Sequence, residues 1–328
     1  MIMTPSLSLS PEACPGQPDD LLTFVRSHPA RRGLFPDGAE PPDAAHPLFV
    51  EREVLAAWAR QQERPLRQVM DECLSRHIWP ERFRRNYGLF SVMAMRRLLG
   101  ARVLLAGCGG LGGHVAGLLA RLGVGAFVLC DPDSFTESNL NRQAFCTEST
   151  LGLPKAEVAA QAVRDMAGHA DVVPHVLAVA ADNLPALLDG VDVALDCLDS
   201  VADKSLLENA CLRAGVSFVH GGVLRHEGMV FRNVPERDTA SAGAPAGALG
   251  SRPDAQPEAG LRRLYPQGQS AAELEAARAA GVSVLSVAGT ACLMVGQCLR
   301  ILLGDAAPGL GRLYHLDSGL PELESFAW

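Results

Sequence analysis

Residues 102–131 read RVLLAGCGGLGGHVAGLLARLGVGAFVLCD, and this stretch decides the fold. It begins with a short apolar run, which predicts a strand buried on both faces. Gly107, Gly109 and Gly112 follow in the pattern G-x-G-x-x-G, whose missing side chains allow a tight turn and let backbone N–H groups approach a phosphate at a helix start. A helical apolar repeat and a second apolar run ending at Asp131 complete a predicted strand–turn–helix–strand unit for binding a nucleotide.

The residues after this unit alternate between apolar runs of strand length and helical repeats, which predicts a parallel sheet with right-handed crossovers. The predicted fold class is α/β: a Rossmann-like, mostly parallel sheet flanked by helices, with antiparallel strands toward the C-terminus and an N-terminal helical extension. Ligands of such sheets bind at the carboxyl ends of the strands. We therefore expect Gly107, Asp131 and Asp199 to converge on one crevice.

Composition changes along the chain predict three parts. Residues 1–46 hold many prolines and few aromatic residues, so we expect a poorly ordered arm with a short helix near 20–28. Residues 47–80 are predicted to form a helical extension, and residues 81–328 the main domain. Within that domain the segment at about 235–262 has no periodicity and is predicted to be a mobile loop.

Charge and hydropathy disfavour several classes of protein. The net charge of −8 argues against a nucleic-acid-binding surface. A long apolar helix is predicted at 282–303, but it carries Gln297 and Arg300, so we expect core or subunit-interface packing and not a membrane span. The N-terminus lacks a basic region followed by an apolar one, so no signal peptide is expected and the predicted location is cytoplasmic. The nine cysteines form no C-x-x-C pair and are interpreted as reduced thiols.

Two polar segments, Ser138–Gln143 (SNLNRQ) and Gly152–Lys155 (GLPK), distinguish the chain from a plain dinucleotide-binding protein. A dehydrogenase needs no Asn, Arg and Lys together after its second strand, whereas a site for substitution at a triphosphate needs fixed cations and donors. With these segments, the sequence resembles the ThiF/MoeB/HesA family, bacterial relatives of ubiquitin-activating enzymes, from about Arg82 to the C-terminus. The resemblance implies an adenylation domain at 81–328 and a crossover loop at about 235–262 over the tail of a carrier protein.

The resemblance implies that ATP is bound by residues matching the family's motifs. Its glycine turn beside ATP is matched by Gly107, Gly109, Gly110 and Gly112. Asp131 matches the acidic residue that binds the ribose hydroxyls. The residues that contact the phosphates are matched by Asn139, Arg142 and Lys155.

Catalytic roles are implied in the same way. Asp199 matches the aspartate that binds Mg²⁺ and is needed for adenylation. Arg85 matches an arginine that reaches into the neighbouring subunit's ATP site, so a homodimer is implied. The implied catalytic residues are therefore Asp199, Arg142, Lys155 and Arg85.

The implied reaction is ATP- and Mg²⁺-dependent adenylation of the C-terminal carboxylate of a small ubiquitin-like sulfur-carrier protein ending in Gly-Gly, as in thiamine or molybdopterin synthesis. The sequence departs from the family pattern at several places. No cysteine stands near Gly260 and Arg263, where zinc ligands should fall, or near Ala277, where some relatives accept the carrier. We therefore expect neither a zinc site nor covalent transfer at that position. Lys204 stands where an Arg is usual, which keeps the charge but loses bidentate geometry.

Other interpretations of these residues stay open. The substrate carboxylate could belong to another molecule, such as a modified tRNA. The chain could also be a non-catalytic ATP-binding regulatory member, or a nicotinamide oxidoreductase. Cys146 and Cys197 are expected near the crevice as packing residues and not as reactive thiols. His220, at a predicted strand end, is interpreted as a satisfied core or rim histidine.

Overall fold

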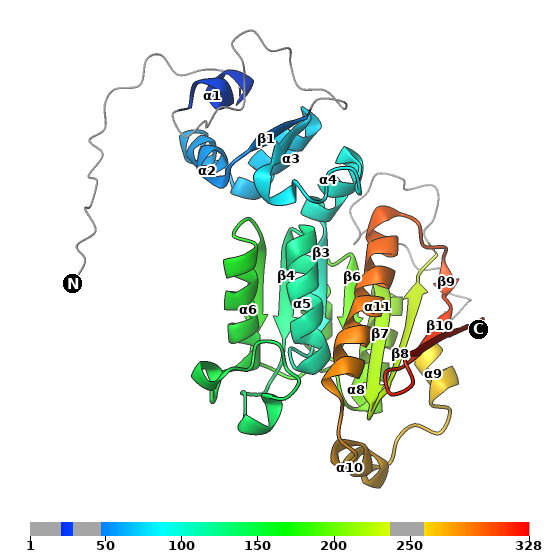
Figure 1. Cartoon of the computed structure of the whole chain (residues 1–328). Helices are drawn as coiled ribbons and strands as arrows, with labels where there is room; N and C mark the ends of the chain where they lie inside the picture. The colour runs from blue at the N-terminus through cyan, green and yellow to red at the C-terminus, as the bar shows by residue number, and fades with distance from the viewer. Residues whose placement is uncertain (1–20, 29–46, 237–258, 328) are drawn as a thin grey trace, which may run out of the picture. The chain divides into compact units, whose positions relative to one another are not determined.

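The computed structural model describes residues 21–28, 47–236 and 259–327 (Figure 1). The chain divides into two compact units, residues 1–85 and 86–328. Most of the expected poorly ordered arm and most of the expected mobile loop at 235–262 lie outside the described residues.

The N-terminal unit is built around two amphipathic helices, which lie within the predicted helical extension at 47–80. These are α2 (Arg52–Gln61) and α3 (Leu66–Ser75), preceded by the short helix α1 (Leu21–Ser27), which was also expected. Strands β1 (Leu48–Val50) and β2 (Ile78–Pro80) pair in parallel and are followed by the 3₁₀ turn η1 (Glu81–Phe83). This small sheet was not predicted, because each strand is only three residues long.

The second unit contains a nine-stranded sheet in the order β11-β10-β8-β7-β6-β3-β4-β5, with β9 paired to β8. Strands β7, β6, β3, β4 and β5 are parallel, and the pairs made by β8 to β11 are antiparallel. The predicted fold class is therefore confirmed. The strand bounds are β3 Arg102–Ala106, β4 Ala126–Cys130, β5 Asp171–His175, β6 Val193–Asp196, β7 Ser217–Leu224, β8 Glu227–Val234, β9 Gly309–Leu310, β10 Leu313–Asp317 and β11 Glu322–Phe326.

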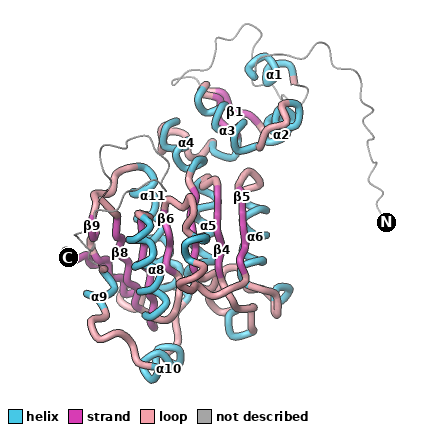
Figure 2. The backbone as a smooth tube through the Cα atoms, turned by 180° about the vertical axis from the view of Figure 1, so that it is seen from behind, coloured by secondary structure: helices cyan, strands magenta, loops and turns pink. Residues whose placement is uncertain are grey.

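Helices cover both faces of this sheet (Figures 1 and 2). One face carries α5, α6 and α11, and the other carries α7 and α8, which enclose a core with Leu104, Ala194 and Phe218 of the sheet. The bounds are α4 Val92–Gly100, α5 Gly110–Leu122, η2 Glu137–Asn139, η3 Glu148–Thr150, α6 Lys155–Met166, α7 Leu184–Leu187, α8 Val201–Ala214, α9 Gly260–Leu264, α10 Ala271–Ala279 and α11 Val284–Leu303.

Helix α11 is long and apolar enough to cross a membrane by length and composition alone, and among the described residues it is the one helix of that kind. It packs on α5, β7 and β8. Its buried face includes Ser286, Thr290 and Gln297, and the Gln297 side chain accepts a hydrogen bond of 2.7 Å from Arg232 of β8. These contacts agree with the predicted packing role.

The strand order places a switch point beside β3. The chain runs from β3 outward to β4 and β5, and then returns to place β6 on the other side of β3. Ligands of open α/β sheets bind at such a point, outside the carboxyl ends of the strands. Gly107, Asp131 and Cys197 are the residues that directly follow β3, β4 and β6.

Candidate active site

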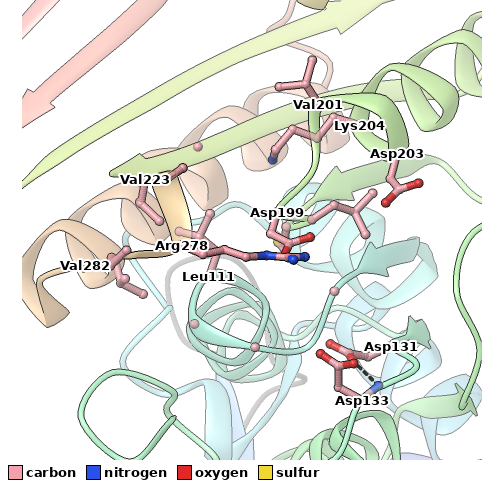
Figure 3. Close-up of a pocket in the computed structure, with 18 of the residues that line it drawn as sticks. Leu111, Asp131, Asp133, Asp199, Val201, Asp203, Lys204, Val223, Arg278 and Val282 are labelled. Atoms are coloured by element: carbon pink, nitrogen blue, oxygen red, sulfur yellow. Dashed lines mark hydrogen bonds and ion pairs between the residues drawn. The ribbon is translucent and has the colours of Figure 1, made fainter. Parts of the chain in front are cut away.

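A pocket of about 750 Å³ opens at this switch point (Figure 3). Its wall combines residues from the ends of β3, β4 and β6 with residues of the β7–β8 hairpin and of α10. The structure therefore brings together eight of the ten residues that the sequence singled out, which lie far apart in the chain: Gly107, Gly109, Gly110, Asp131, Asn139, Arg142, Lys155 and Asp199.

The glycine turn is shaped by close backbone contacts. Gly107 has a φ of +94°, and a Cβ there would lie 2.5 Å from the carbonyl oxygen of Cys197. A Cβ on Gly112 would lie 1.9 Å from the carbonyl oxygen of Gly107. Gly112 does not line the pocket, so its absent side chain serves to pack α5 against the turn. Because α5 begins at Gly110, the free N–H groups of its first turn lie at the pocket.

Asp131 ties the turn to the end of β4. Its side chain is 5% exposed, and its two oxygens accept hydrogen bonds from the backbone N–H groups of Cys108 (2.7 Å) and Asp133 (2.9 Å). Burial raises the pKa of Asp131, and these N–H groups act in the opposite direction. Each carboxylate oxygen keeps a further lone pair, so the residue can accept bonds from ribose hydroxyls as well.

The cations predicted for phosphate binding differ in their partners. Lys155, at the start of α6, is 7% exposed and its Nζ lies 2.9 Å from Oδ2 of Asp133. The Arg142 guanidinium donates to the Ser138 carbonyl and to the Asn141 side chain, both at 2.9 Å, and makes no ion pair with a described residue. Asn139 accepts a bond of 3.1 Å from the Thr136 N–H with its side-chain oxygen, so that oxygen is used in the turn.

Asp199 follows β6 and is about two-thirds exposed in the pocket. Its Oδ2 atom accepts hydrogen bonds from Nη2 (2.9 Å) and Nε (3.3 Å) of Arg278, and Oδ1 has no partner among the described residues. No group of three or more His, Cys, Asp or Glu suited to a metal ion occurs in the described part of the chain. A single exposed carboxylate fits Mg²⁺ that arrives with nucleotide phosphates, which uses one or two carboxylates plus phosphate oxygens and water.

Beneath the pocket lies a buried charge network that sequence analysis did not assemble. Asp196, which is fully buried, accepts hydrogen bonds from Lys204 Nζ (3.2 and 3.3 Å) and from His220 Nδ1 (2.7 Å). Lys204 also donates to the carbonyl oxygen of Gly221 at 2.9 Å. Burial alone would raise the pKa of Asp196, but Lys204 and His220 lower it overall. Burial lowers the pKa of His220, so this ring is neutral at pH 7 and donates through Nδ1.

His220 only partly matches the interpretation of it as a satisfied histidine. Its Nδ1 is bonded to Asp196, but its Nε2 is buried and has no hydrogen-bond partner within the described residues. The reason is the local packing: Nε2 faces Gly222, where a Cβ would lie 3.2 Å away and where no side chain can supply a donor.

Several residues contribute to the pocket that the sequence did not indicate. Arg278 is the main one, because its partner Asp199 lies 79 residues earlier and no local motif links the two. Asp203, Glu227 and Tyr265 also line the pocket. Arg85 is the last residue of the N-terminal unit, so its implied role stays a prediction.

The two cysteines expected near the crevice differ in position. Cys197 lines the pocket, and burial raises its pKa well above the usual range. Cys146 is buried and does not line the pocket.

Comparison with known proteins agrees with this geometry. The model of the ThiF family matches residues 83–327. The SAMP-activating enzyme E1 of Haloferax volcanii is 29% identical over 222 residues, which cover 68% of this chain and 74% of that protein. Adenylyltransferase and sulfurtransferase MOCS3 of Mus musculus is 37% identical over 176 residues, which cover 49% of this chain and 38% of that protein. The molybdopterin-synthase adenylyltransferase of Escherichia coli is 36% identical over 141 residues, or 43% of this chain and 57% of that protein.

Solved structures show the same fold. Escherichia coli MccB with MccA-N7isoASN superposes with a TM-score of 0.57 at 20% sequence identity, covering 75% of this chain and 71% of that one. MccB with ATP superposes with a TM-score of 0.56 at 18% identity, covering 75% and 70% of the two chains. At these identities the likeness establishes the arrangement of the sheet and helices alone.

Proposed function

Because the chain belongs to the ThiF family, we propose that it uses ATP to adenylate the C-terminal carboxylate of a small ubiquitin-like sulfur-carrier protein ending in Gly-Gly. One observation carries the proposal. The glycine turn, an acidic residue at the end of β4, the cations Arg142 and Lys155 and the exposed carboxylate of Asp199 line a single pocket. A dinucleotide domain needs neither the cations nor the second carboxylate.

The pocket residues match the successive parts of ATP. We assign the ribose hydroxyls to Asp131 and the phosphate oxygens to the first N–H groups of α5, a role supported by the helix start at the pocket. Arg142 and Lys155 supply positive charge for the phosphates. Asp199 would hold Mg²⁺, which when bound offsets phosphate charge.

The bond changes in this reaction are simple. A carboxylate oxygen of the carrier forms a bond to the α-phosphorus of ATP, and the bond from that phosphorus to the bridging oxygen of pyrophosphate breaks, so the electron pair leaves with pyrophosphate. The products are an acyl adenylate and pyrophosphate. The role of this chain's residues is to bring two anions together and to neutralise their repulsion, which is positioning and electrostatic stabilisation.

The choice of substrate rests on the named relatives. The archaeal relative is named for activating SAMP, and the bacterial relative for adenylating molybdopterin synthase. The chain spans less than two thirds of the mouse and bacterial relatives, so the carrier and its pathway are part of the proposal. The proposal also includes a homodimer in which Arg85 completes a neighbouring site, a cytoplasmic location, and a fold that uses no zinc.

The test is carrier-dependent exchange of labelled pyrophosphate into ATP. The chain is incubated with Mg²⁺, ATP, labelled pyrophosphate and ubiquitin-like proteins ending in Gly-Gly, including those of molybdopterin synthesis. We expect Asp199→Asn to lower exchange by about 100-fold or more with an unchanged circular dichroism spectrum, because Asp199 is exposed and supports no core contact. Asp182→Asn, at an exposed aspartate outside the pocket, is the matched control.

The outcomes separate the alternatives. If no Gly-Gly protein supports exchange, the carrier assignment is wrong. Binding of tRNA at physiological salt with tRNA-dependent exchange would favour a tRNA-linked carboxylate. Binding of ATP with no exchange for any substrate would favour a regulatory member of the family.

A further inference from the structure

Helix α10 is held firmly over the pocket at both ends. Before its start, the side-chain oxygen of Gln269 accepts a bond of 3.2 Å from the N–H of Val201, two residues after Asp199. After its end, the Gly281 carbonyl accepts a bond of 3.0 Å from the N–H of Arg225 in the β7–β8 turn. The position of Arg278, three residues before Gly281, is therefore set by the same elements that form the pocket wall.

Arg278 presents its guanidinium to a carboxylate. Nε and Nη2 both donate to Oδ2 of Asp199, while Nη1 lies 3.1 Å from Glu275 on the same helix. The planar fork of arginine matches carboxylate geometry better than any other side chain. Figure 3 shows this side chain reaching Asp199 from the side of Val223 and Val282, away from Asp131 and Asp133.

The other cations of the pocket are committed elsewhere. Lys204 uses its ammonium protons on Asp196 and on the Gly221 carbonyl, and it is 4% exposed. Arg142 and Lys155 belong to the segments around Asp131 and Asp133, where the nucleotide is expected. Among the described lining residues, Arg278 is thus the cation that is both exposed and next to the proposed metal ligand.

Resting on the proposed function, we propose that Arg278 is a specificity-determining residue that binds the terminal carboxylate of the acyl substrate after Asp199 has exchanged Arg278 for nucleotide-bound Mg²⁺. The exchange follows from competition for negative charge. Arg278 contacts Oδ2 of Asp199, and a divalent cation bound through the other oxygen, Oδ1, draws negative charge from the carboxylate and weakens its hold on the guanidinium. The released fork then lies beside the place where a carboxylate must approach ATP.

The first arm of the test measures metal–nucleotide binding with no acyl substrate. The probe is Mn²⁺ with a non-hydrolysable ATP analogue, measured by calorimetry and by the Mn²⁺ electron paramagnetic resonance signal. Arg278→Gln removes a competitor for Asp199, so we expect binding about two- to fivefold tighter than wild type, the range for an exposed ion pair. Arg262→Gln, at an exposed arginine of α9 outside the pocket, should bind as wild type does. Unchanged or weaker binding of the Mn²⁺–nucleotide complex by Arg278→Gln would refute the proposal that Arg278 and the metal compete for Asp199.

The second arm measures recognition of the carboxylate. The probe is a ten-residue peptide ending in Gly-Gly, as the free acid and as the C-terminal amide, each added to the enzyme with Mg²⁺ and the ATP analogue. Wild type and Arg262→Gln should prefer the acid by about fivefold or more, Arg278→Gln should lose the preference, and Arg278→Lys should keep part of it. If wild type prefers the acid and Arg278→Gln prefers it equally, the role of Arg278 is refuted while the proposed function stands. If wild type itself shows no preference, the proposed function fails.

Discussion

The buried network beneath the pocket allows a sharp prediction for Lys204→Met. Methionine nearly fills the volume of the lysine stem but removes the ammonium group. The substitution leaves the fully buried Asp196 without a cation, bonded only to His220 and to the backbone N–H of Leu198, and removes the Lys204 donor from the Gly221 carbonyl. An uncompensated charge in such a place is costly because neither water nor a cation can reach it.

The expected loss in the free energy of unfolding is about 3–5 kcal/mol, the usual cost of removing one partner of a buried ion pair. For a unit of this size that corresponds to a fall in melting temperature of about 6–20 °C. Urea titrations followed by circular dichroism measure the loss. Lys204→Arg, which keeps the charge, should lose much less.

A double-mutant cycle separates the charge from the packing. Adding Asp196→Asn to Lys204→Met removes the stranded charge, so the double variant should be more stable than the sum of the two single losses predicts. A loss below about 1 kcal/mol in Lys204→Met, or additive losses in the cycle, would refute the reasoning that the ion pair between Lys204 and Asp196 stabilises the domain.

Three further predictions address the turn, the histidine and the thiols. Gly112→Ala should unfold the domain or abolish ATP binding in calorimetry, because the new Cβ would lie 1.9 Å from a backbone oxygen. The control Gly296→Ala has nothing within 4 Å of its new Cβ, so it should be neutral or stabilise α11 by up to about 1 kcal/mol. Equal behaviour of the two variants would contradict the packing argument. Burial lowers the pKa of His220 below its unfolded value of 6.5, so the contribution of this residue to stability is present above pH 6.5 and is lost as the pH falls through the folded pKa. In His220→Gln the free energy of unfolding, measured with urea, should therefore depend less on pH between 7 and 5. Iodoacetamide at pH 7 should label the exposed Cys292 faster than Cys197, whose pKa is raised by burial, and peptide mass spectrometry showing the reverse order would contradict this.

Much of the fold and part of the site could be predicted from sequence because their signals are local. The glycine turn, the helix that follows it and the strand ending at Asp131 lie within thirty residues. The alternation of strands and helices then determines which ends of the strands meet. Convergence of Gly107, Asp131 and Asp199 on one pocket followed from that rule.

The residues that were missed depend on contacts between distant segments. Arg278 sits on a short helix with no apolar face of its own, and its importance appears only when α10 is placed over Asp199. Asp196, Lys204 and His220 come from three elements, β6, α8 and β7, and no spacing rule connects them. Gly112 is a different case, because it was predicted as part of the glycine turn but acts by packing against the nearby Gly107.

The ion pairs of the pocket wall also have a kinetic consequence. Five carboxylates and four cations line the pocket among the described residues: Asp131, Asp133, Asp199, Asp203 and Glu227 against Arg142, Lys155, Lys204 and Arg278. Three of the cations already contact a carboxylate. An approaching anion therefore meets no net positive field that could steer it, and the chain carries a net charge of −8, so its association rate should rise with ionic strength as salt screens the repulsion. After an anionic ligand has arrived, the rate of stable binding is then governed by how fast the lining cations leave their carboxylate partners and bind the ligand.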